Sequence, residues 1–302
     1  IATAIFIAAV NLRGVEGFAK VAEKIMPLSA AVIFIITFIA IGRNFSAVPN
    51  AFYQIVTGAF SYQAAAGGFL GAGIMIAMRF GVARGVFSNE AGLGSAPIYH
   101  AKAKTDHPVK QGMWGALEVF IDTHVICTLV ALVIITSGYW TYVDAAGVRL
   151  VGAPLVVEAF NSAVPGFGGW AITIAIVLFG STTIAGWGFY GEKGLEYLFG
   201  TKTNMAYRLL WIGAVVLGSL GNLSFVWAFT DVFAAFMLVP NLISVFALGG
   251  VVSKLTKDFF AGNAYVSHYE RELQLAAGIT PAQQNAIQKS LTPETKEVTE
   301  TV

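Results

Sequence analysis

Long uninterrupted apolar runs are the feature that most limits how this chain can fold. They occupy 25–42, 66–89, 112–138, 170–199, 208–221 and 226–252. Most of them approach the roughly 20 residues that a helix needs to cross a bilayer. Because lipid offers no partners to open backbone groups, each run is predicted to be helical. The sequence therefore predicts an all-α polytopic membrane protein.

The two ends of the chain differ in character. The opening residues, IATAIFIAAV, are apolar and lack a basic flank or a cleavage pattern. We therefore expect the end of a membrane helix rather than a signal peptide, and a chain that is part of a longer protein. From about residue 262 the sequence turns polar. Two parts are predicted: a transmembrane transporter core at 1–261, truncated at its N-terminus, and a polar cytoplasmic tail at 262–302.

The charge balance supports a lipid environment and excludes several classes of partner. Hydrophobic residues make up 56% of the chain and charged residues only 12%, whereas about a quarter of residues are charged in soluble domains. A net charge of +1 offers no basic surface for nucleic acid, and the one cysteine, Cys127, excludes a disulfide framework. The lipid bilayer is the expected partner.

Lysine and arginine are distributed unevenly between the connections. They gather before the first run, within 102–110, around 193–208 and at 254–257, whereas the connections in between carry only Arg43 or Arg149. Because basic connections stay in the cytoplasm, six full spans with a cytoplasmic C-terminus are predicted. The segment 139–169 is too broken for a span and is expected outside, either as a lid or re-entrant element or as an inert loop.

Glycines crowd the second apolar run. Gly67, Gly68, Gly71 and Gly73 lie close together, and each lowers helix stability by up to about 1 kcal/mol relative to alanine. A helix that breaks here would expose backbone groups able to bind a substrate or ions, as in inverted-repeat transporters. The alternative is that these small residues let neighbouring helices pack closely.

Two threonines lie deep inside the run at 170–199. Thr182 and Thr183 are about 12 residues from its start, which is close to the bilayer midplane at a rise of about 1.5 Å per residue. Their hydroxyl oxygens suit a weakly bound alkali cation. The alternative is that both hydroxyls bond to carbonyls one turn earlier. Thr183 shares a helical stripe with Gly180 and Trp187.

Acidic side chains inside predicted spans form a third group. Glu118 and Asp122 are four residues apart, with His124 two further on. They could form a proton relay, hold neighbouring helices through structural hydrogen bonds, or lie in the cytoplasmic headgroup zone. Asp231 lies a turn or two from the outer end of the last run, where it could gate a vestibule or have no role. Soluble-enzyme motifs such as HExxH, GxSxG or a Walker loop do not occur, so an enzyme is not expected.

The stretch GVFSNEAGLGSAP at 85–97 interrupts an apolar run with polar residues and glycines. It lies about 22 Å beyond the glycine cluster at helical rise, which predicts a position near the cytoplasmic surface. Its glycines and Pro97 are expected to end the helix, while Asn89 and Glu90 cap it or pair with Arg84 and the basic loop beyond. We interpret the stretch as a hinge or gate and expect the binding chemistry several turns upstream.

Several long motifs occur in one order along the chain. They are RFGVARGVFSNEAGLGSAPIYHAKAKTDHPVKQG, EVFIDTHVICTLVALVI, STTIAGWGFYGEKGLEYLFG and YRLLWIGAVVLGSLG ahead of TDVFAAFMLVPNL. Over about residues 13–254 the chain resembles the alanine or glycine:cation symporters. The resemblance implies a LeuT-type fold of two inverted five-helix repeats, of which this chain would supply the end of the first and all of the second. The first core helix would precede residue 1, so this chain alone is not expected to transport.

The resemblance also implies roles for individual residues. Gly71 and Gly73 would belong to the broken sixth core helix and bind substrate, while Thr182 and Thr183 would hold one sodium ion on the eighth. Trp187 would face the substrate side chain and keep the pocket small.

Three further residues complete the expected site. Ile76 stands where the family often carries a polar residue, so a substrate contact from this position would be apolar. Asp231 and Asn89 are the expected gating residues.

The function implied by the resemblance is sodium-coupled symport of alanine or glycine by alternating access. Sodium is the coupling ion, and the location is the inner (plasma) membrane of a bacterium or archaeon. Two alternatives stay open. One is proton-coupled symport carried by Asp122 and His124, and the other is a non-transporting membrane sensor on the same scaffold.

Overall fold

The computed structural model describes residues 14–60, 70–143 and 147–262, together with Tyr265, Thr280 and Gln283. At 14–21, 59–60, 70–77 and 223–224 it describes the backbone alone. The chain divides into two compact units. Unit 1 comprises Ile1–Asn89 and Phe120–Phe233, and unit 2 comprises Glu90–Val119 and Ala234–Val302. Most of the predicted tail lies outside the described residues.

Unit 1 is built from helices. They are α2 (Gly14–Arg43), η1 (Phe45–Ala47), α3 (Val48–Phe60), α4 (Leu70–Asn89), the π-helical η3 (Phe120–Ile126), α7 (Cys127–Ser137), η4 (Tyr139–Thr141), α8 (Ala153–Ala163), α9 (Gly168–Phe199), η5 (Thr201–Thr203), α10 (Asn204–Leu220) and the first part of α11 (Leu223–Phe260). Within the described residues there is no strand, and one antiparallel bridge joins Val143 and Arg149. The all-helical prediction is confirmed for this part of the chain.

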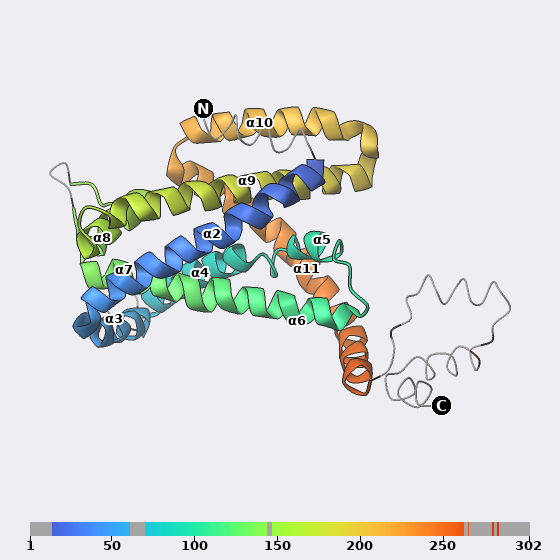
Figure 1. Ribbon diagram of the computed structural model, residues 1–302, viewed down its shortest axis with the longest axis horizontal. Helices are drawn as coiled ribbons and strands as arrows, with labels where there is room; N and C mark the ends of the chain where they lie inside the picture. Colours follow the sequence, from blue (N-terminus) through green and yellow to red (C-terminus); the bar gives the residue numbers. More distant parts are fainter. Residues whose placement is uncertain are drawn as a thin grey trace. The chain divides into compact units, whose positions relative to one another are not determined.

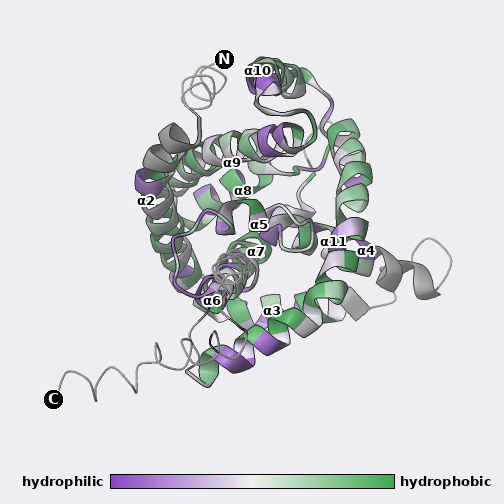
Figure 2. Cartoon of the chain, turned by 90° about the vertical axis from the view of Figure 1, so that its right-hand side faces the viewer, coloured by the Kyte–Doolittle hydropathy of each residue, from purple (hydrophilic) through white to green (hydrophobic). Residues whose placement is uncertain are grey.

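The core of unit 1 forms where α2, α7, α8 and α9 meet. α2 and α9 run side by side (Figure 1), and the turned view in Figure 2 shows the same pairing. The buried residues of the core are Ile36, Ala40, Val133, Phe160, Ala163, Ala171 and Ile172. Burying a side chain the size of Phe160 contributes about 1.5–3 kcal/mol, so α8 is firmly held in this core.

The segment 139–169 is therefore more than an inert loop. α8 forms its centre, with a proline in its first turn and Phe160 completely buried. The turn into α9 is also tight, because a Cβ built on Gly168 would lie 2.2 Å from the carbonyl oxygen of Phe160. Glycine at this position lets α8 fold back against α9.

Four described stretches are long and apolar enough to cross a membrane. They are Ala22–Arg43, Pro108–Ser137, Gly168–Phe199 and Phe225–Phe260, which match four of the six predicted spans. The other two correspond to α4, which carries Arg79 and Arg84, and to α10, which has 17 residues. Large apolar side chains are widely exposed on these helices, as at Phe246, which is 82% exposed. Such surface suits lipid or further protein rather than water.

Unit 2 contains two short helices beside the second part of α11. They are α5 (Ala96–His100) and α6 (Pro108–Val119). His107 caps α6, because the amide of Val109 donates to its Nδ1 atom at 3.2 Å. The imidazole ring lies against Phe259 and Tyr265, at centroid distances of 4.9 and 5.3 Å. Burial lowers the pKa of His107 below its usual value.

Candidate functional site

The chain leaves the helical conformation directly after α4. Glu90 has a φ of 56°, in the left-handed region that side chains rarely adopt, and Gly94 has a φ of 78°. The amides of Leu93 and Gly94 both donate to the carbonyl of Glu90, at 3.0 and 3.1 Å. The hydroxyl of Ser95 donates to the Glu90 carboxylate at 3.0 Å. We call residues 90–95 the broken segment.

Asn241 on α11 holds the broken segment from the side. Its Nδ2 atom donates to the carbonyl oxygens of Ala91 and Gly92, at 2.9 and 2.8 Å. The contact is close, because a Cβ on Gly94 would lie 2.8 Å from the Asn241 Oδ1 atom. All of these residues belong to unit 2. The sequence signal for Asn241 was a lone amide after Pro240 in an apolar helix, and it was missed.

The helix breaks at a different place from the one that the glycines predict. α4 is uninterrupted from Leu70 to Asn89 and includes Gly71, Gly73 and the backbone of Ile76. Gly71 and Gly73 keep a regular helical backbone, so within the described residues the helix does not break at these two positions. Gly67 and Gly68 lie outside the described residues.

Aromatic side chains from three helices meet near the end of α4, within unit 1. The rings of Phe87 and Trp187 stack at a centroid distance of 5.9 Å. Phe87 also meets Trp227 of α11 edge to face at 5.7 Å, and Trp187 meets Tyr190 in the same way at 5.7 Å. Trp187 thus forms part of an aromatic cluster, which we call the Trp187 wall, and its contact with a substrate stays a prediction.

An ion pair borders this aromatic wall. Arg84 of α4 donates to the carboxylate of Asp231 on α11, and its guanidinium lies 4.2 Å from the centre of the Trp227 ring. Both partners are about one-third exposed, so screening keeps the pair modest in energy. The expected pairing of Arg84 with Asn89 or Glu90 is wrong, since Arg84 reaches Asp231 instead. Asp231 therefore has a definite partner on another helix.

The two threonines of α9 point in different directions. Thr182 is 2% exposed, and its hydroxyl lies 2.9 Å from the carbonyl of Phe179 and 3.1 Å from that of Leu178. The same hydroxyl lies 3.2 Å from the sulfur of Met26 on α2. Thr183 is exposed and lies one turn before Trp187. For Thr182 the structure matches the expected bond to carbonyls one turn earlier.

Asn89 ends α4 and bonds within it. Its Nδ2 atom donates to the carbonyl of Gly85 at 2.7 Å. This bond satisfies one of the last carbonyls of the helix, immediately before Glu90 turns left-handed. Asn89 thus lies at the junction between α4 and the broken segment.

The acidic group at 118–124 is split by a change of helix type. The π-helical η3 begins at Phe120, between Glu118 and Asp122. Glu118 pairs with His100 at 3.5 Å. Asp122 accepts from the hydroxyl of Ser88 at 2.5 Å and from that of Thr123 at 3.1 Å. Within the described residues the two carboxylates therefore have separate partners, which does not fit a relay between them.

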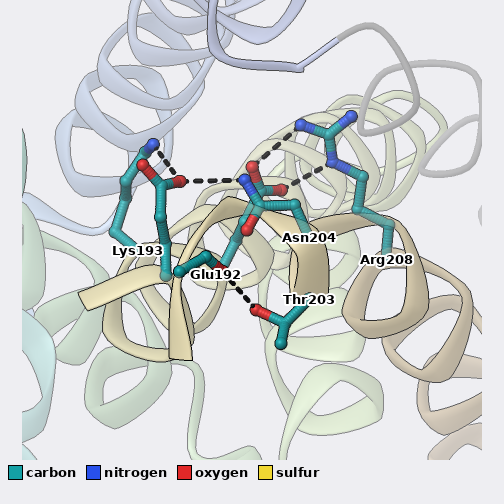
Figure 3. A network of polar contacts seen from close by, with 7 residues as sticks. Glu192, Lys193, Thr203, Asn204 and Arg208 are labelled. Carbon is teal, nitrogen blue, oxygen red and sulfur yellow. Dashed lines mark hydrogen bonds and ion pairs between the residues drawn. The ribbon is translucent and has the colours of Figure 1, made fainter. Parts of the chain in front are cut away.

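A buried ion pair joins α9 to α10. Glu192 is 6% exposed and receives two bonds from Arg208, at 2.6 and 2.8 Å. Figure 3 shows this pair beside a second contact group, in which Lys193 and Asn204 both bond to Glu196. The bidentate geometry is the strong form of an arginine–carboxylate contact. It fixes the turn between the two helices, and sequence spacing alone did not predict it.

The site contains polar groups suited to small ligands and no cluster typical of a transition metal. Among the described residues, no group of three or more His, Cys, Asp or Glu side chains could hold a metal ion. Unit 2 offers backbone carbonyls and the amide of Asn241, and unit 1 offers hydroxyls and aromatic rings. The long apolar helices define a helical membrane protein.

Comparison with known proteins gives the family. The model of the sodium:alanine symporter family matches residues 1–271. The chain is 40% identical over 256 residues to the sodium/alanine symporter AgcS of Methanococcus maripaludis, covering 85% of this chain and 55% of that protein. It is 38% identical over 250 residues to the probable sodium/glutamine symporter GlnT of Bacillus subtilis, covering 82% and 50%. The chain belongs to the sodium:alanine symporter family, a family of transporters rather than enzymes.

A third relative differs in the ion that its name gives. The putative sodium/proton-dependent alanine carrier protein YrbD of Bacillus subtilis is 31% identical over 258 residues, covering 82% of this chain and 52% of that protein. The chain spans about half the length of these curated relatives. As a family member with several apolar helices, it is a multi-pass membrane protein.

Proposed function

We propose that the protein is a sodium-coupled symporter of small neutral amino acids, alanine or glycine, that works by alternating access in a bacterial or archaeal plasma membrane. The observation that carries this proposal is the broken segment. Non-helical backbone in a membrane protein is tolerated where it is buried in protein or lines a polar cavity. Transporters of the inverted-repeat class use such segments to bind substrates and ions. A LeuT-type arrangement is part of the proposal.

The proposed substrate contacts follow from the chemistry of the broken segment. Carbonyls such as those of Ala91 and Gly92 can accept hydrogen bonds from an ammonium group, which every amino acid carries. Gly71, Gly73 and Ile76 lie in regular helix, where backbone groups bond to one another. We therefore move the proposed backbone contacts from Gly71 and Gly73 to residues 90–95.

Aromatic packing supports a small substrate. Trp187 is wedged between Phe87 and Tyr190, so its ring has little freedom to move aside for a long side chain. The names of AgcS and of YrbD refer to alanine, whereas GlnT is named for glutamine. We propose alanine or glycine here because two of these three relatives are named for alanine and because Trp187 is held by rings on both sides within unit 1.

The proposed sodium ligand is Thr183, with Thr182 in a supporting position. Thr182 uses its hydroxyl within unit 1, whereas Thr183 is exposed on the stripe of Trp187. A neutral hydroxyl oxygen suits an ion that must be released each cycle. Asp231 of α11 with Arg84 is the proposed gate, and Asn89 is the proposed hinge, because Arg84 and Asn89 lie in the last turns of α4, directly before the broken segment.

The sodium assignment is tested in the full-length gene product. Thr183→Val removes the hydroxyl and keeps the shape, so the sodium concentration for half-maximal alanine uptake into proteoliposomes should rise about tenfold, as expected for about 1.4 kcal/mol. Thr173→Val is the matched control, because that hydroxyl bonds to Gly169 within the same helix. Equal sodium half-saturation in the wild type and Thr183→Val would contradict the assignment. Absence of any uptake would favour a non-transporting sensor.

A further inference from the structure

Asp122 lies in the middle of a membrane-spanning stretch without a basic partner. It is in the centre of Pro108–Ser137, and the ion pairs found within the described residues do not include it. Glu192 and Asp231, by contrast, each face a guanidinium. A bare carboxylate at this depth is costly, so such groups are neutralised by a proton, by an ion or by a partner.

Hydroxyl groups surround the Asp122 carboxyl instead. Ser88 of α4 and Thr123 donate to its Oδ2 atom, and the Ser88 hydroxyl also lies 3.7 Å from the sulfur of Cys127. A hydroxyl can donate to an ionised carboxylate and can equally accept from a protonated one. The same contacts therefore serve both protonation states, which a guanidinium partner would not allow.

The backbone around Asp122 also departs from regular helix. It lies in η3, where seven residues form π-helix between α6 and α7. Such segments are rare and occur frequently at functional sites, because the extra residue loosens the helical bonding. Ser88 and Cys127 are exposed within unit 1, so other side chains of unit 1 do not fully cover the carboxyl on this side.

The charged neighbours of Asp122 are already engaged or lie elsewhere. On α4, Arg84 binds Asp231 and Arg79 lies over the ring of Phe80. On η3 itself, the ring of His124 stacks on Phe120 at 5.6 Å. On α7, the titratable neighbour is the Cys127 thiol. The carboxyl is left with hydroxyl partners alone among these groups.

We propose that Asp122 is a proton-binding site that couples proton movement to amino acid transport. One carboxylate oxygen takes a proton from water on one side of the membrane and returns it to water on the other, and Ser88 and Thr123 hold the carboxyl in both states. The O–H bond is the only bond made and broken. This inference rests on the proposed transport function, and it names a second coupling ion at a site separate from Thr183.

The test uses the full-length gene product in proteoliposomes without a sodium gradient. An inward gradient of about one pH unit should drive accumulation of labelled alanine up to about tenfold in the wild type. Asp122→Asn should abolish proton-driven accumulation while sodium-driven uptake persists. Ser88→Ala removes one hydroxyl partner and should reduce the proton-driven component. Proton-driven uptake that is equal in the wild type and Asp122→Asn would overturn the proposal.

A second measurement does not depend on transport. Infrared difference spectra between acidic and alkaline pH should show a protonated-carboxyl band in the wild type, shifted in Ser88→Ala and missing in Asp122→Asn. A wild type without this band, or with a band unaffected by Ser88→Ala, would overturn the proposal. A raised sodium half-saturation in Asp122→Asn without any pH effect would also overturn it, by assigning a sodium ion to the site. Loss of all uptake with a normal band would refute the proposed function and leave the proton site standing.

Discussion

Replacing Asn241 tests how the broken segment is held. One amide group of Asn241 donates to the carbonyls of Ala91 and Gly92, 150 and 149 residues earlier in the chain. Each such bond contributes about 0.5–1.5 kcal/mol net. Ala91 is exposed, so its carbonyl can find another partner when Asn241 is removed. We therefore expect a loss of about 1.4 kcal/mol for Asn241→Leu, which corresponds to about tenfold in an opening equilibrium.

Amide hydrogen exchange measures this opening directly. The amides of Leu93 and Gly94 bond to the Glu90 carbonyl inside the broken segment. In Asn241→Leu their exchange should become about tenfold faster, because the turn opens more often. Leucine branches at the same atom as asparagine and lacks the amide donor, and Gly94, which has no side chain, leaves room for its larger methyl groups.

The matched control lies one turn further along α11. Ser244→Ala removes a hydroxyl that bonds only to the Pro240 carbonyl of its own helix in the described contacts. Exchange of the Leu93 and Gly94 amides should stay within about twofold of the wild type in this control. If Asn241→Leu also left these amides unchanged, Asn241 would not hold the segment, and our account of the break would be refuted.

Two further predictions concern stability, and both are read as the thermal midpoint of the purified protein. Gly168→Ala should destabilise the folded protein by about 2–3 kcal/mol, because the new Cβ would lie 2.2 Å from the Phe160 carbonyl oxygen. Gly180→Ala is the control, because no atom lies near its Cβ. Equal midpoints for the two variants would contradict the packing of α8. Burial lowers the pKa of His107, so the folded state binds fewer protons than the unfolded state below about pH 6.5. The stabilisation that neutral His107 gives the folded state is complete above that pH and is lost as the pH falls toward the folded pKa. His107→Asn keeps a capping side chain and should make the thermal midpoint less dependent on pH. An unchanged pH dependence would exclude His107 as its source.

Helix positions were the part of the fold that the sequence could predict. The apolar run at 170–199 corresponds to α9, which ends at Phe199, because Gly200 with its φ of 81° stops the helix. Apolar length and a following glycine are local signals that act within one element. Local signals of this kind also predicted that the stretch at 85–97 ends a helix.

The contacts that hold the broken segment could not be predicted from local signals. Glycine density favoured a break at Gly71 and Gly73, yet glycines remain helical where the surroundings permit. The actual break depends on Glu90 in a left-handed conformation and on Asn241, which is distant in sequence. Propensity differences of about 1 kcal/mol per glycine are smaller than what such tertiary bonds can contribute together.

The side-chain partners of the site were likewise hidden in the sequence. Arg84 and Asp231 are 147 residues apart, and Ser88 and Asp122 are 34 apart. Spacing arguments paired Asp122 with Glu118 instead, because they assume a regular α-helix through this region. In the structure Glu118 pairs with His100 and Asp122 with Ser88, and both partners come from other helices.

The central claim is sodium-coupled uptake of a small neutral amino acid. The most direct measurement is uptake of labelled alanine by proteoliposomes that contain the full-length gene product, with equal pH on both sides. We predict that an inward sodium gradient drives accumulation above equilibrium, and that dissipating the gradient with a sodium ionophore abolishes it. Alanine uptake that is the same with and without the sodium gradient would contradict the account.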